Sequence, residues 1–322
     1  MDDLSITTLM GIGGFVVGAV FGALTYRTNF CTMGSISDAV SFGDFSRARA
    51  WMLAIAVAIL GSQLLYVSGT VNLADSIYLG PSLRWFSNIL GGLVFGVGMV
   101  LASGCPARNL ARVGGGDLKA LVVLIFVGMF GYMTMRGLIA PGRVLIEDAT
   151  NVDLSQLGIP NQHLGSFIAQ GLSVTGTQVH IFLAVLVSAL MAIFCFSNAE
   201  FRRSAGLVAV GLGAGVLVTA GWWVTGVLGA DEFEPVPLAS LTFIAPAGDG
   251  LQYLMTYTGA TISFGIASVA GAIAGAFVAA LSGRTFQMTS FYDKSDTLRH
   301  MIGGAMMGVG GVFALGCTIG QG

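Results

Sequence analysis

Residues 91–105 read GGLVFGVGMVLASGC, and residues 303–317 read GGAMMGVGGVFALGC. The two segments share glycines and a Gly-Cys end in the same register: Gly91, Gly92, Gly96, Gly98, Ala102, Gly104 and Cys105 recur as Gly303, Gly304, Gly308, Gly310, Ala314, Gly316 and Cys317. Small residues inside an apolar run let transmembrane helices approach closely. The pair therefore predicts two copies of one unit, each an apolar helix that ends in a cysteine-bearing break.

The composition around these segments is that of a membrane protein. Of 322 residues, 55% are hydrophobic and 9% are charged, and the 48 glycines follow no collagen-like period. A net charge of −2 without a basic cluster argues against a nucleic-acid partner. Asp2 and Asp3 stand where a secretory signal peptide carries positive charge, which argues against a signal peptide. We therefore expect an all-α polytopic membrane protein.

Apolar runs of about the length needed to cross a bilayer occur eight times. A hydrocarbon core of roughly 30 Å needs about 20 helical residues. The runs are Leu9–Tyr26, Trp51–Ser68, Trp85–Ser103, Leu118–Ile139, His180–Ser197, Leu207–Leu228, Leu251–Leu281 and Met301–Leu315. The seventh is interrupted at Thr256–Thr261, which leaves room for a half-helix before a full crossing. The sequence thus predicts eight or nine transmembrane helices.

Positive charge collects in alternate connections between these runs. With the N-terminus outside, the inner connections hold eleven Lys and Arg residues, and the outer ones hold only Arg84 and Arg143. Cytoplasmic loops carry such an excess, so we expect the N-terminus on the outer side of the membrane. Arg136 lies near the outer end of a run, where snorkelling to the interface is the simpler interpretation and substrate steering the alternative.

By this count the run before Cys105 points inward and the run before Cys317 points outward. Two copies of opposite direction form an inverted repeat, which in transporters places the substrate site near the midplane between broken helices. We expect one transmembrane transporter domain over residues 1–322, with repeat one at about 8–140, a connector at about 141–204 and repeat two at about 205–322. The first copy continues into a further apolar run whereas the second stops at Gly322, so we expect the sequence to be truncated there.

Three of the four cysteines stand where an apolar helix breaks, in the segments RTNFCTMGS (27–35), GCPARN (104–109) and GCTIGQG (316–322). Non-helical backbone at membrane depth is tolerated only where it is buried in protein or lines a cavity. Proline is favoured at the first helical position, so Pro106 predicts a half-helix whose free N–H groups face whatever Cys105 contacts. The candidate substrate-binding residues are Cys31, Cys105, Cys317, Gly104, Pro106, Gly316, Thr318 and Gly320.

Such breaks suit a small, soft anion. Helix N-termini supply a positive field without buried Lys or Arg side chains, and the S–H group is a weak donor on a polarisable atom. Three protonated thiols along a narrow path would bind a sulfur-bearing anion without retaining it. A thiolate would repel the anion, so we expect the cysteines to remain protonated.

A packing role is the alternative for each cysteine, because free Cys is among the most buried residue types. It is the preferred interpretation for Cys195, inside an unbroken apolar run, whereas the shared register of Cys105 and Cys317 favours function. Cys31 has less support because no glycine precedes it. The spacing of the cysteines and histidines fits no metal site, and no triad or carboxylate pair is apparent. We expect no metal, no cofactor and no catalytic residue.

The three cysteine motifs resemble those of the YeeE/YedE family of bacterial inner-membrane sulfur transporters, whose characterised members take up thiosulfate. The resemblance covers nearly the whole chain through Arg27 to Cys31, Gly104 to Gly116 and Gly316 to Gly322, of which the last is the most specific. It implies an hourglass-like fold of about nine transmembrane helices with re-entrant half-helices, in which the three cysteines line the pathway. It also implies a cytoplasmic partner, a sulfur carrier of the TusA-like or rhodanese-like kind.

Three functions stay open at this point. The first is uptake of thiosulfate across the inner membrane, with the ion passed along three thiols by S–H hydrogen bonds; a permease for another sulfur or selenium species is its variant. The second is a membrane sulfurtransferase that forms a cysteine persulfide. The third is a structural subunit whose Gly-Cys loops are packing devices. We favour transport, with thiosulfate and membrane lipid as the contacting molecules and no enzymatic activity.

Overall fold

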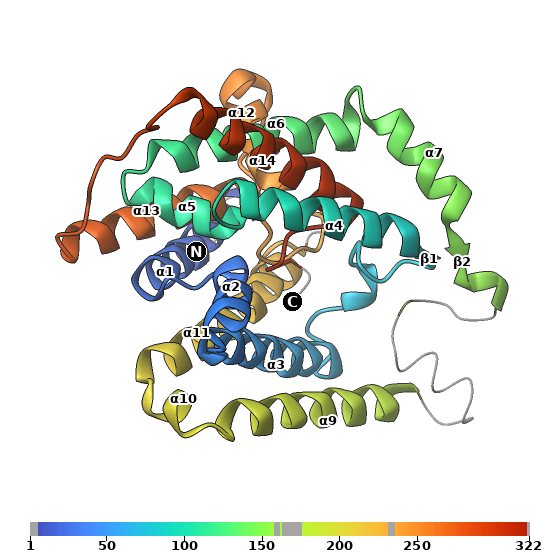
Figure 1. Cartoon of the computed structure of the whole chain (residues 1–322). Coiled ribbons are helices and arrows are strands. Elements are labelled where there is room, and N and C mark those ends of the chain that lie inside the picture. The colour runs from blue at the N-terminus through green and yellow to red at the C-terminus, as the bar shows by residue number, and fades with distance from the viewer. Residues whose placement is uncertain (1–5, 158–161, 163–175, 231–235, 321–322) are drawn as a thin grey trace.

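The computed structural model describes residues 6–157, 162, 176–230 and 236–320. Helices form nearly all of its regular structure (Figure 1). The elements are α1 (Ile6–Thr28), α2 (Thr32–Phe42), α3 (Ser46–Val67), η1 (Leu73–Asp75), β1 (Ser82–Leu83), α4 (Trp85–Leu101), α5 (Pro106–Gly114), α6 (Leu118–Arg136), α7 (Ala140–Thr150), β2 (Val152–Asp153), η2 (Leu154–Leu157), α9 (Gly176–Phe196), α10 (Ala199–Arg203), α11 (Ala205–Trp223), η3 (Val224–Leu228), α12 (Ala245–Met255), η4 (Tyr257–Gly259), α13 (Phe264–Ser282) and α14 (Lys294–Phe313). The expected all-α class is confirmed.

Long apolar helices dominate the described part of the chain. Seven segments are long and apolar enough to cross a membrane: Ile6–Phe42, Ser46–Val67, Trp85–Gly114, Leu118–Arg136, Gln178–Phe196, Ala205–Leu228 and Phe264–Ser282. The expected run Met301–Leu315 falls in α14, which is not among the seven and carries Lys294, Asp296 and Arg299 in its first turns. α14 nevertheless packs along both α4 and α6, and the three lie side by side in Figure 1. Seven of the eight expected runs therefore each coincide with one long helix, and the chain is a multi-pass membrane protein.

The expected run Leu251–Leu281 proves to be two helices. The short helix α12 begins at Ala245, ahead of the apolar run, because Pro246 at its first turn sets the N-terminus. It ends at Met255, and α13 begins at Phe264 behind a cap in which the Ser263 hydroxyl accepts from the N–H of Ile266 at 3.3 Å. The half-helix is present, but the sequence placed its start too late.

Helices distant in sequence pack with their backbones in contact. α1 lies along α13, and α3 lies along α11. A Cβ atom on Gly22 or Gly275 would overlap the backbone of the facing helix, and one on Gly215 would lie 2.6 Å from the carbonyl oxygen of Ala54. Such contacts replace the hydrophobic effect as the source of association between helices in lipid.

The outside of the bundle is apolar. Leu64, Leu93, Phe182 and Ile193 are among many large hydrocarbon side chains that the structure leaves exposed. A water-soluble monomer rarely exposes contiguous apolar area of this kind. A bilayer solvates such a surface well.

Candidate functional site

The two Gly-Cys loops share one backbone turn. After α4, Ser103 and Gly104 have φ angles of 58° and 156°; after α14, Leu315 and Gly316 have φ angles of 63° and 152°. In each loop the glycine N–H donates to the carbonyl five residues earlier, at 3.0 Å and 2.8 Å. This is the 6→1 bond of a Schellman-type helix end. The likeness of the two segments therefore extends from their sequences to their backbone conformation.

Cys105 stands at the start of a half-helix. It is the extended N-cap residue of α5, with φ −71° and ψ 166°, and Pro106 is the first helical residue, as the sequence predicted. The buried Asn109 side chain holds the turn, because its Nδ2 donates to the carbonyls of Gly104 at 2.9 Å and Cys105 at 3.2 Å. The N–H groups at the start of α5 give this end of the helix a partial positive charge.

Cys31 stands at the start of a second half-helix. α1 ends at Thr28, Asn29 reverses the chain with φ 52°, and Cys31 is the extended N-cap residue of α2. The Arg108 guanidinium of α5 donates to the Asn29 side chain through Nη1 at 3.1 Å, so the two cysteine loops are joined. The positive charge of Arg108 therefore lies near Cys31.

The structure brings three cysteines together. The side chains of Cys31 and Cys105 are in hydrogen-bond contact, and Cys317 lies in their neighbourhood. Each of the three is 1% exposed. Cys195 is buried as well, but its thiol donates to the carbonyl of Arg49 at 3.1 Å, as a packing residue would. The sequence-distant loops therefore meet in the interior, while the fourth cysteine is engaged by α3.

Cys317 has a hydroxyl for a neighbour where Cys105 has a thiol. The Oγ1 atom of Thr242, in the irregular segment before α12, lies 3.9 Å from the Cys317 Sγ atom. A Cβ atom on Gly320 would lie 3.1 Å from Thr242 Oγ1 and 3.2 Å from the Tyr78 hydroxyl, so the chain passes close to both groups. The last two residues of the predicted motif, 321 and 322, lie outside the described residues.

Two hydroxyls beside the cysteines lack partners. Thr32 follows Cys31 and Thr318 follows Cys317, and the Oγ1 atoms of both threonines are buried without a hydrogen-bond partner among the described residues. Buried polar atoms are nearly always paired, so such an atom needs an explanation. A ligand that accepts hydrogen bonds at the cysteine loops supplies one.

The sequence interpretation missed four of these residues. Asn109, Thr242, Tyr78 and Thr32 contact or flank the cysteines without having been expected to. Two signals pointed to them. Thr32 has the same place after a cysteine as Thr318, and Thr242 precedes Pro246 in a break of the kind seen at Pro106.

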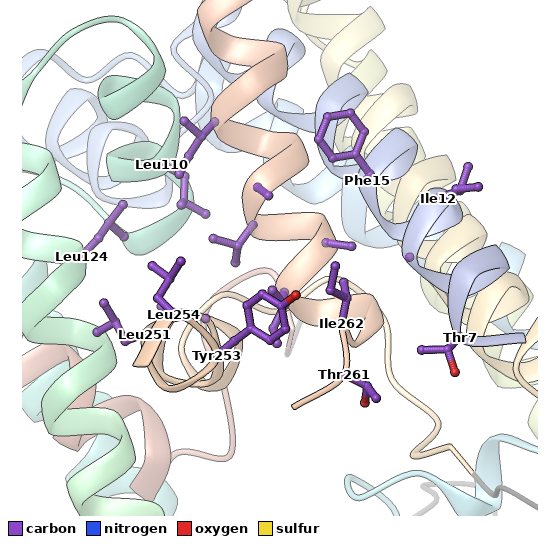
Figure 2. Close-up of a pocket in the computed structure, with 18 of the residues that line it drawn as sticks. Thr7, Ile12, Phe15, Leu110, Leu124, Leu251, Tyr253, Leu254, Thr261 and Ile262 are labelled. Atoms are coloured by element: carbon purple, nitrogen blue, oxygen red, sulfur yellow. The ribbon is translucent and has the colours of Figure 1, made fainter. Parts of the chain in front are cut away.

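A large apolar cavity is not part of this site. It has a volume of about 960 Å³ and lies among α1, α5, α6, α12 and α13, where Figure 2 shows Phe15, Leu124, Leu251 and Leu254 lining it. Its described lining holds no charged side chain, and hydrocarbon predominates. Two smaller cavities, of about 190 and 200 Å³, flank residues 315–320 and are lined by polar groups as well. Across the described residues, no group of three His, Cys, Asp or Glu side chains is placed to hold a metal ion.

The chain is similar to known transporters over nearly its full length. The family model described as "Sulphur transport" matches residues 27–322. The thiosulfate transporter TsuA of Escherichia coli (strain K12) is 27% identical over 329 aligned residues, which cover 97% of this chain and 86% of that protein. The thiosulfate transporter TsuA of Spirochaeta thermophila (strain ATCC 700085 / DSM 6578 / Z-1203) is 26% identical, with 96% of this chain and 89% of that protein covered. The chain therefore belongs to the sulphur transport family, the YeeE/YedE family that its cysteine motifs resemble.

Proposed function

We propose that the protein imports thiosulfate across the bacterial inner membrane, with its N-terminus in the periplasm. The ion passes along the thiols of Cys317, Cys105 and Cys31 by successive S–H hydrogen bonds. The observation that carries this proposal is the meeting of three buried cysteines from separate loops, two of them in side-chain contact. The names of the two relatives support thiosulfate as the cargo.

The surroundings of the cysteines suit a dianion with one soft end. The starts of α2 and α5 supply N–H groups and a partial positive charge. The terminal sulfur of thiosulfate is a weak, polarisable acceptor for a thiol, and its oxygens are acceptors for the Thr32 and Thr318 hydroxyls. Weak donors release the ion as readily as they hold it, which conduction requires.

Uptake of radiolabelled thiosulfate in a bacterial strain that lacks other sulfate and thiosulfate importers tests the proposal. Wild-type protein should support uptake, and Cys105→Ala should abolish it. Cys195→Ala is the matched control, because Cys195 is equally buried but bonded to the Arg49 carbonyl instead of another cysteine. Uptake and growth that survive Cys105→Ala would contradict the thiol path.

A sulfurtransferase is the second candidate, and the contact between Cys31 and Cys105 favours it. In that reaction a thiolate attacks the terminal sulfur of thiosulfate, the S–S bond of the ion breaks, sulfite leaves and a cysteine persulfide remains. Mass spectrometry after exposure to thiosulfate separates the two functions. Transport by hydrogen bonding leaves every cysteine at its original mass, whereas the persulfide adds one sulfur atom. The same uptake assay with selenium-containing and other sulfur anions decides whether the cargo is broader.

We also propose a TusA-like sulfur carrier as the cytoplasmic partner that receives the ion. The expected inner face is basic, with Arg27, Arg202, Arg203, Arg284 and Arg299 among its charges. Electrostatic complementarity of this kind speeds encounter with an acidic partner. Co-purification of the two proteins at low salt, and its loss at high salt, checks the partnership.

A further inference from the structure

A second group of polar residues lies next to the loop that carries Cys317. It surrounds the cavity of about 200 Å³, which is lined by Ile77, Tyr78, Arg84, Met135, Arg143, Thr242, Ile244, Ala245, Gly311, Val312, Leu315 and Gly316. The cavity reaches the thiol loop directly, because it is bounded by Gly316 and by Thr242, whose hydroxyl lies 3.9 Å from the Cys317 Sγ atom. We call it the arginine vestibule.

The walls of the arginine vestibule are held by short strands and an ion-pair network. β1 ends one residue before Arg84, and β2 follows α7, which carries Arg143 and Glu147. The two strands pair antiparallel and tie the start of α4 to the end of α7, as Figure 1 shows. The Arg143 Nε atom donates to the carbonyl of Thr134 at 3.0 Å, which anchors this side chain to the end of α6.

The charges in the network do not cancel. Arg84 Nη1 lies 3.1 Å from Glu147 Oε2, and Arg143 Nη1 lies 2.8 Å from both carboxylate oxygens of Glu147. Two guanidinium groups therefore share one carboxylate, and one positive charge is left over. Arg84 and Arg143 line the cavity and Glu147 is not among its lining residues, so the cavity is bordered by the positively charged members of the network.

The arginine vestibule also offers neutral donors and enough room. Tyr78 lines both small cavities, and burial raises the pKa of its hydroxyl well above the ordinary value, so the phenol stays a neutral donor. With about 30 Å³ for each water molecule in the liquid, a volume of about 200 Å³ holds a five-atom oxyanion and several waters. The volume is too small for an organic ligand of drug size.

We propose that the arginine vestibule is the outer binding site for a small divalent sulfur oxyanion, which waits there beside Thr242 before its sulfur meets Cys317. This inference rests on the proposed function for the direction of movement. Arg84 and Arg143 select for anion charge and bind oxygen atoms, whereas the thiols select for soft sulfur. The arginine vestibule therefore accepts sulfate as well as thiosulfate, and the discrimination between them comes later on the path.

The test asks whether substrate affinity follows the net charge of the arginine vestibule or the shape of its side chains. Arg84→Gln leaves one arginine opposite Glu147, so the net charge falls to zero, and the KM for thiosulfate uptake should rise about tenfold through lost charge-assisted hydrogen bonding. The double variant Arg84→Gln with Glu147→Gln leaves Arg143 alone and restores one positive charge. It should recover most of the affinity although it changes more of the structure. Arg136→Gln is the control, because Arg136 ends α6 outside this cavity.

Sulfate provides a second readout. It should inhibit thiosulfate uptake competitively in the wild type and much less in Arg84→Gln, without itself being imported. An unchanged KM in both Arg84→Gln and Arg143→Gln overturns the proposal, and so does a double variant that stays as weak as the single one. If the single variants do not reach the membrane, Glu147→Gln serves instead: its extra charge should lower the KM, and an unchanged KM rejects the site.

The same variants distinguish this inference from the proposed function. Equilibrium binding of labelled thiosulfate to the purified full chain in detergent requires no transport. If the wild type fails to import thiosulfate but binds it with an affinity that Arg84→Gln weakens about tenfold, the proposed function fails and the arginine vestibule stands. If the wild type imports the ion and both Arg→Gln variants import it equally well, only the inference fails.

Discussion

The hydroxyl of Thr242 lies 3.9 Å from the thiol of Cys317. Cys31 meets Cys105 in a similar way, with one side chain from a segment before a short helix and the other from a Gly-Cys loop. The packing follows the same pattern, because α1 lies along α13 and α11 lies along α3. We infer that Thr242 occupies, in the later part of the chain, the place that Cys31 occupies in the earlier part.

Replacing Thr242 by Val should weaken uptake of thiosulfate moderately. Valine keeps the shape of the side chain but removes the donor and acceptor beside Cys317. A lost neutral hydrogen bond of about 0.5–1.5 kcal/mol corresponds to a rise in KM of about two- to tenfold. Thr242→Ser keeps the hydroxyl and should behave almost as the wild type. Kinetics of uptake in proteoliposomes check this, and equal KM values for the Val and Ser variants would count against a polar role.

Cys317→Ser should lower thiosulfate uptake more than it lowers stability. The serine hydroxyl fits the site, but oxygen is a harder atom than sulfur and a poorer match for the terminal sulfur of the ion. The free energy of unfolding should fall by about 1 kcal/mol, as expected for a conservative substitution of a buried residue. Parallel measurement of uptake and of thermal unfolding separates the two effects. A variant that loses stability but transports normally would favour a packing role for the loop.

Gly104→Ala should destabilise the cysteine loop. At a φ of 156°, an L side chain is strained, and the cost is of order 1–3 kcal/mol. Gly92→Ala is the matched control on the same helix α4, where a Cβ atom would meet nothing within 4 Å and alanine favours the helix. We expect a lower melting temperature and reduced uptake for Gly104→Ala only. Equal melting temperatures for both variants would show that the loop tolerates the strain.

Because of Tyr78, the stability of the folded protein should decrease as the pH rises into the alkaline range. Burial raises the pKa of its hydroxyl above 10.0, the ordinary value. The unfolded chain therefore ionises first, so the stabilising effect is complete below about pH 10 and declines as pH rises above it. Tyr78→Phe should flatten that decline, whereas the exposed Tyr257→Phe should not. Melting temperatures between pH 8 and pH 11 compare the variants; parallel curves for wild type and Tyr78→Phe would refute the assignment.

Local sequence signals located much of this fold. The half-helix at Cys105 was predictable because proline at a first helical position has a fixed φ and lacks an N–H group. The Gly-Cys turn was predictable because the same residues recur after α14. The start of α12 was misplaced, because the prediction followed the apolar run from Leu251 and did not use the helix-start signal of Pro246.

The residues around the cysteines were harder to find. Thr242 is one threonine in an apolar stretch, and only the return of the chain toward Cys317 gives it a role. Arg84 and Arg143 were read as the sparse charge of outer loops, and their meeting at Glu147 depends on how α4 packs against α7. Contacts of this kind come from tertiary packing, which no spacing along a single chain records.

The pairing of α1 with α13 and of α3 with α11 interlocks the two ends of the polypeptide. During synthesis, α1 and α3 enter the bilayer long before their partners, with Gly22 and the Ala54 carbonyl facing lipid instead of the neighbouring backbone. The early helices can therefore pack fully only after the late helices have been inserted. If the chain were divided at its connector, α1 and α3 would lie in one fragment and their partners α13 and α11 in the other, so neither fragment could complete its helix packing alone.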